Sequence, residues 1–190
     1  MRHFGRVGGA TVVAALVCVC ALTGCSSSHV ADSSSTTSST SSTSTTPSTS
    51  PTPPTTSAAS AVIAAYRASW SAFEGALADA NPSAPALAAT MTDSQLEGVK
   101  ANLLADQQQG VVGKGPTTLH PKVTAVLGTA ATVVDCAYSA TELVYKATGK
   151  PVPPVTPPEN DGVTATLVLS GGAWKVSKQT VTDGKCAPGT

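Results

Sequence analysis

The chain has 190 residues with 11 basic and 11 acidic side chains, so its formal charge at neutral pH is zero. Without a run of Lys and Arg, the sequence lacks the positive surface that binding to nucleic acid through phosphates requires. It also lacks a polybasic segment for anionic lipid head groups, so attachment to a membrane would need another cause.

The first 24 residues have the order of parts found in export signals. Arg2 and Arg6 give a cationic start, and an apolar run follows from Val7 to Leu22. This run is diluted by glycine and threonine, and it is shorter than the roughly 20 strongly apolar residues of a membrane-spanning helix. A cleaved signal over residues 1–24 therefore fits better than an uncleaved anchor, which stays open as the alternative.

The signal closes on Leu22-Thr23-Gly24-Cys25. These residues resemble the lipobox of bacterial lipoprotein precursors. The resemblance implies that the thiol of Cys25 receives a diacylglyceryl group and that the chain is cut just before it. Two acyl chains on one residue give stable anchoring, so we expect a protein held at the extracytoplasmic face of the cell membrane. An ordinary secretory signal with a coincidental cysteine is the alternative.

Residues 25–59 are expected to form a disordered tether. Every residue from Ser33 to Ser57 is Ser, Thr or Pro. Such a segment has no apolar surface to offset the entropy lost on ordering, and its prolines favour extended conformations. The composition suits a bare spacer and an O-glycosylated stalk equally well.

Residues 60–190 are expected to fold as one α+β domain that begins with helices. Asn81-Pro82 would end the first helix, Ser60–Ala80. Residues 85–91 suit a short second helix. The apolar side chains of the first helix recur every three or four positions, as in an amphipathic helix, at Ile63, Tyr66, Trp70, Phe73 and Leu77.

A third helix is predicted to follow at once. Thr92-Asp93-Ser94-Gln95 has the pattern of a capping box, in which the first and last side chains bond each other's main chain at a helix start. Gly110 suits the left-handed position that ends such a helix.

The chain then turns to strand-like patterns with two hairpins. Gly128-Thr129-Ala130 separates the strands of the first hairpin, and Gly171-Gly172 those of the second. A proline-rich loop, residues 149–162, lies between the hairpins. The expected strands are residues 111–116 at an edge, 122–127, 131–138, 143–145, 163–169 and 174–181.

Two cysteines stay unassigned in the domain. Cys18 and Cys20 leave with the signal, and Cys25 carries the lipid. Cys136 and Cys186 are then an even pair in a compartment where disulfides persist, so a bridge is expected, with two free buried thiols as the alternative.

The domain resembles the NTF2-like, or SnoaL-like, cone fold. Gly171–Val176 looks like its terminal strand, and Tyr66–Trp70, Asp135-Cys136 and Gly184-Lys185-Cys186 look like a group of actinobacterial secreted proteins and lipoproteins of this shape. The resemblance covers about residues 61–186. It implies helices packed on a curved antiparallel sheet, a bridge between the two cysteines, and no settled activity.

Cone-fold enzymes of the isomerase and cyclase types place an Asp or a His in the mouth of the cone, so Asp135 and His120 are the candidates here. A catalytic histidine needs a partner to fix its tautomer, and the sequence indicates none. We interpret Asp135 as a solvated or capping carboxylate. We expect Asp135 and His120 to lie beyond hydrogen-bond reach of each other, with at least one of them well exposed. The aromatic rings of Tyr66, Trp70 and Phe73 are expected to fill the cone.

The sequence therefore predicts no catalytic residue, no metal site and no cofactor. The favoured function is a lipid-anchored binding or scaffold module of the cell envelope, with a small apolar ligand or an envelope protein as its partner and no nucleic acid. A cone-fold isomerase-like or cyclase-like enzyme is one alternative. A structural spacer or surface antigen is the other.

Overall fold

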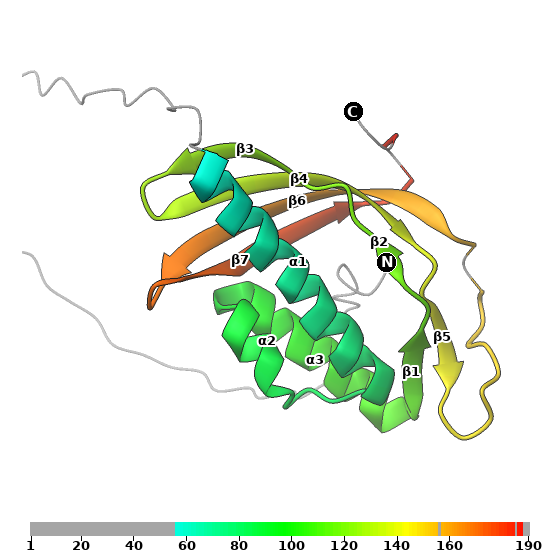
Figure 1. Cartoon of the computed structure of the whole chain (residues 1–190). Helices are drawn as coiled ribbons and strands as arrows, with labels where there is room; N and C mark the ends of the chain where they lie inside the picture. The colour runs from blue at the N-terminus through cyan, green and yellow to red at the C-terminus, as the bar shows by residue number, and fades with distance from the viewer. Residues whose placement is uncertain (1–55, 156, 185, 188–190) are drawn as a thin grey trace, which may run out of the picture. The chain divides into compact units, whose positions relative to one another are not determined.

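The computed structural model describes residues 56–155, 157–184 and 186–187 (Figure 1). The predicted signal, Cys25 and residues 25–55 of the predicted tether lie outside these ranges. In the described part of the chain, helices come first and strands follow, so the α+β class is confirmed.

The helices are α1 (Thr56–Asp79), α2 (Pro85–Thr90) and α3 (Asp93–Gln109). Helix α1 begins at Thr56 rather than at Ser60, so it takes in the last residues assigned to the tether. Its buried stripe contains Tyr66, Trp70, Phe73 and Leu77 as predicted, but Val62 is buried where Ile63 was expected, and Ile63 is half-buried.

The predicted capping box at the start of α3 does not form. Thr92 occupies the N-cap position, but its side chain makes no capping hydrogen bond. Its main-chain N–H instead donates to the carbonyl of Val176, 2.9 Å away, so a strand fixes the entry of the helix. The predicted end is correct: Gly110 has φ 66° and its N–H bonds the carbonyls of Asp106 and Gln107.

The main sheet is antiparallel, with the order β2-β4-β6-β7, and β3 also pairs with β4. A separate two-stranded sheet joins β1 to β5. The strands are β1 (Val111–Lys114), β2 (Thr117–Thr118), β3 (Lys122–Leu127), β4 (Ala130–Ser139), β5 (Glu142–Tyr145), β6 (Glu159–Ser170) and β7 (Ala173–Thr182).

Both predicted hairpins are confirmed, and β6 is longer than predicted. It begins at Glu159 inside the expected proline-rich loop, because Glu159 pairs with Ser139 and Gly162 with Cys136 at the end of β4. Strand β2 was not predicted. A run of two residues carries no periodic signal.

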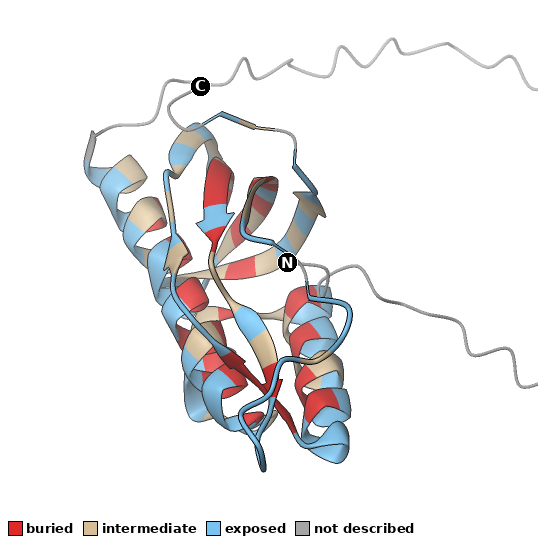
Figure 2. Ribbon diagram, turned by 90° about the vertical axis from the view of Figure 1, so that its right-hand side faces the viewer, coloured by how far each residue is buried: buried red, intermediate tan, exposed pale blue. Residues whose placement is uncertain are grey.

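The three helices pack against one face of the curved main sheet (Figure 1). Buried positions are concentrated where the helices and sheet face each other (Figure 2). Leu87 and Leu103 belong to the same buried cluster as Val133, Ala165 and Leu167.

Cys136 and Cys186 form the predicted disulfide, with their Cα atoms 5.7 Å apart. The bridge ties β4 to the last described residues of the chain. None of the described helices is long and apolar enough to cross a membrane.

Candidate functional site

Asp135 is buried beneath α1. It lies on the face of β4 that also buries Ala131, Val133 and Ala137, because side chains on a strand alternate between faces. Only 6% of Asp135 is exposed. Asp135 was interpreted as a solvated or capping carboxylate. It is not solvated, since the helix layer removes it from water.

Both carboxylate oxygens of Asp135 accept hydrogen bonds. The hydroxyl of Tyr66, a fully buried residue of α1, donates to Oδ2 at 3.0 Å. The main-chain N–H of His120 donates to Oδ1 at 2.6 Å. These bonds offset part of the free-energy cost of burying the carboxylate.

Burial changes the acidity of both partners. It raises the pKa of Asp135 above its ordinary value of 3.8, against the opposing effect of the hydrogen bonds from His120 and Tyr66. Burial, and next the negative charge of Asp135, raise the pKa of Tyr66 as well. The phenol therefore stays protonated and acts as the donor in this pair.

His120 contacts Asp135 through its main chain. The prediction that the two residues lie beyond hydrogen-bond reach was wrong, while the prediction that one of them is exposed is confirmed by His120. Its ring Nδ1 lies 2.9 Å from the carbonyl oxygen of Cys136. A carbonyl can only accept, so Nδ1 carries the proton. The imidazole is thus held by the main chain of β4.

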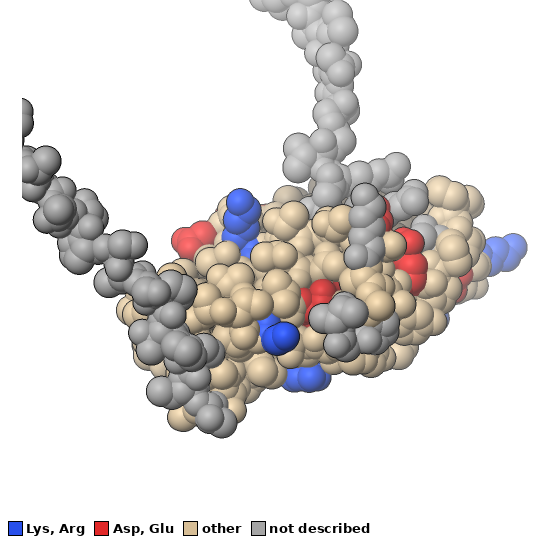
Figure 3. Space-filling model, turned by 90° about the horizontal axis from the view of Figure 1, so that it is seen from above, with Lys and Arg blue, Asp and Glu red and all other residues tan. Residues whose placement is uncertain are grey.

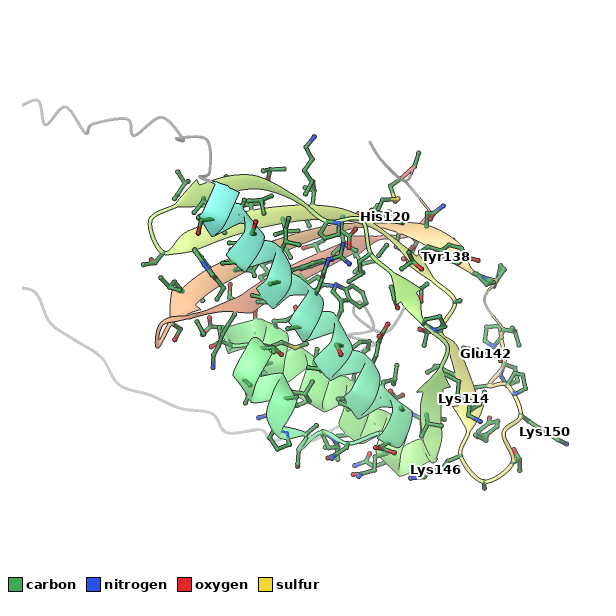
Figure 4. The ribbon with its side chains drawn as sticks, in the orientation of Figure 1. Lys114, His120, Tyr138, Glu142, Lys146 and Lys150 are labelled. Carbon is green, nitrogen blue, oxygen red and sulfur yellow. A yellow bond between two sulfur atoms is a disulfide. The ribbon has the colours of Figure 1, made fainter. Side chains whose placement is uncertain are left out.

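Strand register explains this contact. Lys122 of β3 pairs with Val134 of β4, so the residues just before β3 lie beside Asp135 and Cys136. Figure 4 shows His120 at this place in the fold. The sequence prediction missed Tyr66 as the partner of Asp135. The available signal was a tyrosine on a buried stripe, because a buried phenol hydroxyl needs a hydrogen-bond partner.

Aromatic rings fill the interior beside this pair, as predicted. Tyr66 and Trp70 meet edge to face with centroids 6.4 Å apart, and Trp70 meets Phe73 in the same way at 6.2 Å. All three side chains are at most 9% exposed. These three rings therefore pack against one another beneath α1 next to the Tyr66–Asp135 pair.

A groove of about 360 Å³ lies between α1 and the segment around β2; we call it the α1–β2 groove. Arg67 Nη2 donates to the carbonyl of Leu119 at 3.3 Å, and Glu74 Oε1 accepts from the N–H of Thr117 at 2.9 Å. The residues that line the groove are Arg67, Trp70, Ser71, Glu74, Thr117, Thr118 and Leu119.

A second cavity, of about 280 Å³, lies between the turn joining β4 to β5 and the proline-rich loop. Glu142 and Glu159 line it together with Val155 and two prolines. In the described ranges, no three His, Cys, Asp or Glu side chains are grouped as a metal site would require.

Surface charge is scattered. Figure 3 shows single charges of both signs on a largely uncharged face. Lys114, Lys146 and Lys150 lie near the β1–β5 end of the domain, with Glu142 on β5 beside them (Figure 4). The described part of the face in Figure 3 therefore has no strong field of one sign to steer a charged macromolecule.

No family model and no curated protein matches this sequence. The intermembrane space region of the chloroplast protein ARC6 superposes with a TM-score of 0.54 at 15% identity, covering 66% of this chain and 96% of that chain. This likeness shows a shared fold alone.

Two further solved structures match less well. A protein from Novosphingobium aromaticivorans, provisionally named a scytalone dehydratase, has a TM-score of 0.45 at 15% identity, covering 64% of this chain and 83% of that chain. A provisionally named dehydratase of the NTF2-like family from Streptomyces avermitilis has a TM-score of 0.41 at 14% identity, covering 65% and 94%. TM-scores this low carry no argument about activity.

Proposed function

We propose that this chain is a lipid-anchored, extracytoplasmic binding or scaffold module of the cell envelope. The hydrogen bonding of Asp135 carries the non-catalytic part of this proposal. A general base must reach the proton that it removes, whereas both oxygens of this carboxylate are held by Tyr66 and by the main chain of His120. With the adjacent interior filled by aromatic rings, the buried acid has a structural task.

The envelope location has separate support. The Cys136–Cys186 bridge suits an oxidising compartment, where disulfides persist. The lipobox-like residues before Cys25 and the Ser/Thr/Pro composition that follows agree with an anchored domain on a spacer. Acyl chains on Cys25 would make the membrane its first partner.

A cone-fold enzyme of the isomerase or cyclase type is the second candidate. The observation in its favour is a buried carboxylate with a raised pKa beside a buried phenol, a combination that acid–base sites use. Such an enzyme needs an accessible apolar interior. The neutral fluorophore N-phenyl-1-naphthylamine tests this with the unacylated Cys25→Ala protein. Saturable binding that quenches tryptophan emission would show an open apolar interior, which the enzyme needs and which a module for a small apolar ligand would also use. No saturable binding would contradict the enzyme and favour a scaffold or a module that binds an envelope protein.

Fatty-acid labelling tests the anchor. In a bacterial host that processes lipoproteins, the full chain should incorporate an alkyne-tagged fatty acid and partition into the detergent phase. Cys25→Ala should lose both properties, because the acceptor thiol is gone. Cys20→Ala, within the apolar run, is the matched control and should label normally. Labelling that persists in Cys25→Ala contradicts the proposal.

A further inference from the structure

We propose that the α1–β2 groove binds a short zwitterionic peptide, with its terminal carboxylate at Arg67 and its terminal ammonium at Glu74. This inference rests on the binding role proposed above and assigns it a site and a ligand class.

The two ends of the groove carry opposite charges. Arg67 and Glu74 both line it and lie about two turns apart on α1, which places their backbones about 10 Å apart along the helix axis. A ligand with one charge would suit only one end. A neutral ligand such as a saccharide would leave both charges without a charged partner.

Both charged side chains have bonding capacity left. Arg67 directs one N–H at Leu119, and a guanidinium has five such donors. Glu74 uses Oε1 for the N–H of Thr117, which leaves Oε2. Within the described part of the chain, neither side chain has another hydrogen bond or an ion pair. A carboxylate at Arg67 and an ammonium at Glu74 would each form charge-assisted hydrogen bonds.

The middle of the groove suits peptide groups. The hydroxyls of Ser71, Thr117 and Thr118 line it and can donate to or accept from amides. Its volume of about 360 Å³ lies near the lower end of the range for small-molecule sites. An extended chain spans about 3.3–3.6 Å per residue, so three residues match the separation of the Arg67 and Glu74 backbones along α1.

The wall opposite α1 is already fixed in place. Three side chains form hydrogen bonds with the main chain of this wall. Glu74 accepts from the N–H of Thr117, Arg67 donates to the carbonyl of Leu119, and Asp135 accepts from the N–H of His120. A site that is formed before the ligand arrives loses little conformational entropy on binding. This gives the buried Asp135 a part in shaping the groove.

Titration calorimetry with tri-alanine tests the inference on the full chain in a polyoxyethylene detergent. We expect a Kd on the order of 1 mM or tighter. N-acetyl-tri-alanine and tri-alanine amide should each bind about tenfold more weakly, because each lacks one charge-assisted contact. In Glu74→Gln, acetylation of the peptide should no longer change its affinity, and in Arg67→Gln amidation should no longer change it. The control variants Glu97→Gln and Lys178→Gln, at exposed sites elsewhere, should show the same effects of acetylation and amidation as the wild type.

Three results would overturn the assignment: no heat of binding with tri-alanine, equal affinity for the free and capped peptides, or binding of neutral maltotriose that is stronger than that of tri-alanine. Failure here is distinguishable from failure of the proposed function. If the chain is acylated at Cys25 but does not bind tri-alanine, the peptide site in the groove is contradicted and the lipid-anchored location is not.

Discussion

The hydrogen bond between Tyr66 and Asp135 joins the helix layer to the sheet at a single buried point. A buried carboxylate without partners would lose its hydration with no compensation. Here Tyr66 satisfies one oxygen from α1 and the N–H of His120 satisfies the other from the approach to β3. The pair therefore fixes how three segments sit against one another.

Removing the phenol hydroxyl should destabilise the fold. Tyr66→Phe leaves Oδ2 of Asp135 buried without its donor, which should lower the free energy of unfolding by about 1–3 kcal/mol. Urea unfolding measures this change. Tyr138→Phe, at a side chain that is 39% exposed, is the matched control. A loss no larger than that of the control would contradict the structural role of the pair.

The raised pKa of Asp135 predicts a pH dependence with a definite sign. A folded state that holds this proton more tightly than the unfolded state gains stability at low pH and loses it as pH rises from about 3.8 through the folded pKa. The unfolding free energy of the wild type should therefore fall over this window relative to that of Asp135→Asn. If the unfolding free energy of the wild type rises relative to that of Asp135→Asn as pH rises, the raised pKa of Asp135 is contradicted.

The contacts at Asp135 show why a site is harder to predict than its residues. Asp135 and His120 were identified as the titratable candidates, but their contact depends on the pairing of β3 with β4. Tyr66 is 69 residues away from Asp135 in the sequence. No local pattern specifies which strand residue will lie beneath a given turn of α1, so the hydrogen bond could not be predicted.

Elements whose signal is local were predicted well. Apolar spacing indicated α1, Gly110 indicated the end of α3, and glycine turns between β-branched runs indicated both hairpins. Details set by tertiary contacts were predicted less well. The capping box at Thr92 gave way to a bond with Val176 on β7, and β6 was extended to Glu159 by its pairing with β4.

Two glycines illustrate close packing and open space. A Cβ at Gly113 of β1 would lie 2.5 Å from a methyl group of the buried Leu77, whereas a Cβ at Gly98 of α3 would meet nothing within 4 Å. Gly113→Ala should therefore destabilise by about 1–3 kcal/mol through overpacking. Gly98→Ala should stabilise by about 0.5–1 kcal/mol through helix propensity. Thermal and urea unfolding of both variants measure these changes in stability. If the two variants changed stability by the same amount and in the same direction, the packing of β1 against α1 would be contradicted.

At the scale of the whole molecule, the disulfide constrains the unfolded chain. Cys136 and Cys186 close a loop of 50 residues. On the chain-entropy model, opening such a loop lowers the free energy of unfolding by about 4 kcal/mol, a large part of a typical domain's stability. The double variant Cys136→Ala/Cys186→Ala should lose about this much in urea unfolding, and an unchanged midpoint would show that the bridge does not stabilise the fold.

We propose an anchored domain of the cell envelope, and the mass of the protein extracted from membranes distinguishes an anchored chain from an unprocessed one. We expect a chain that begins at Cys25 and carries the added mass of a diacylglyceryl group. Digestion without reductant should yield a peptide pair linked through Cys136 and Cys186. A chain that retains Met1, an unmodified Cys25, or free thiols at both domain cysteines would contradict it.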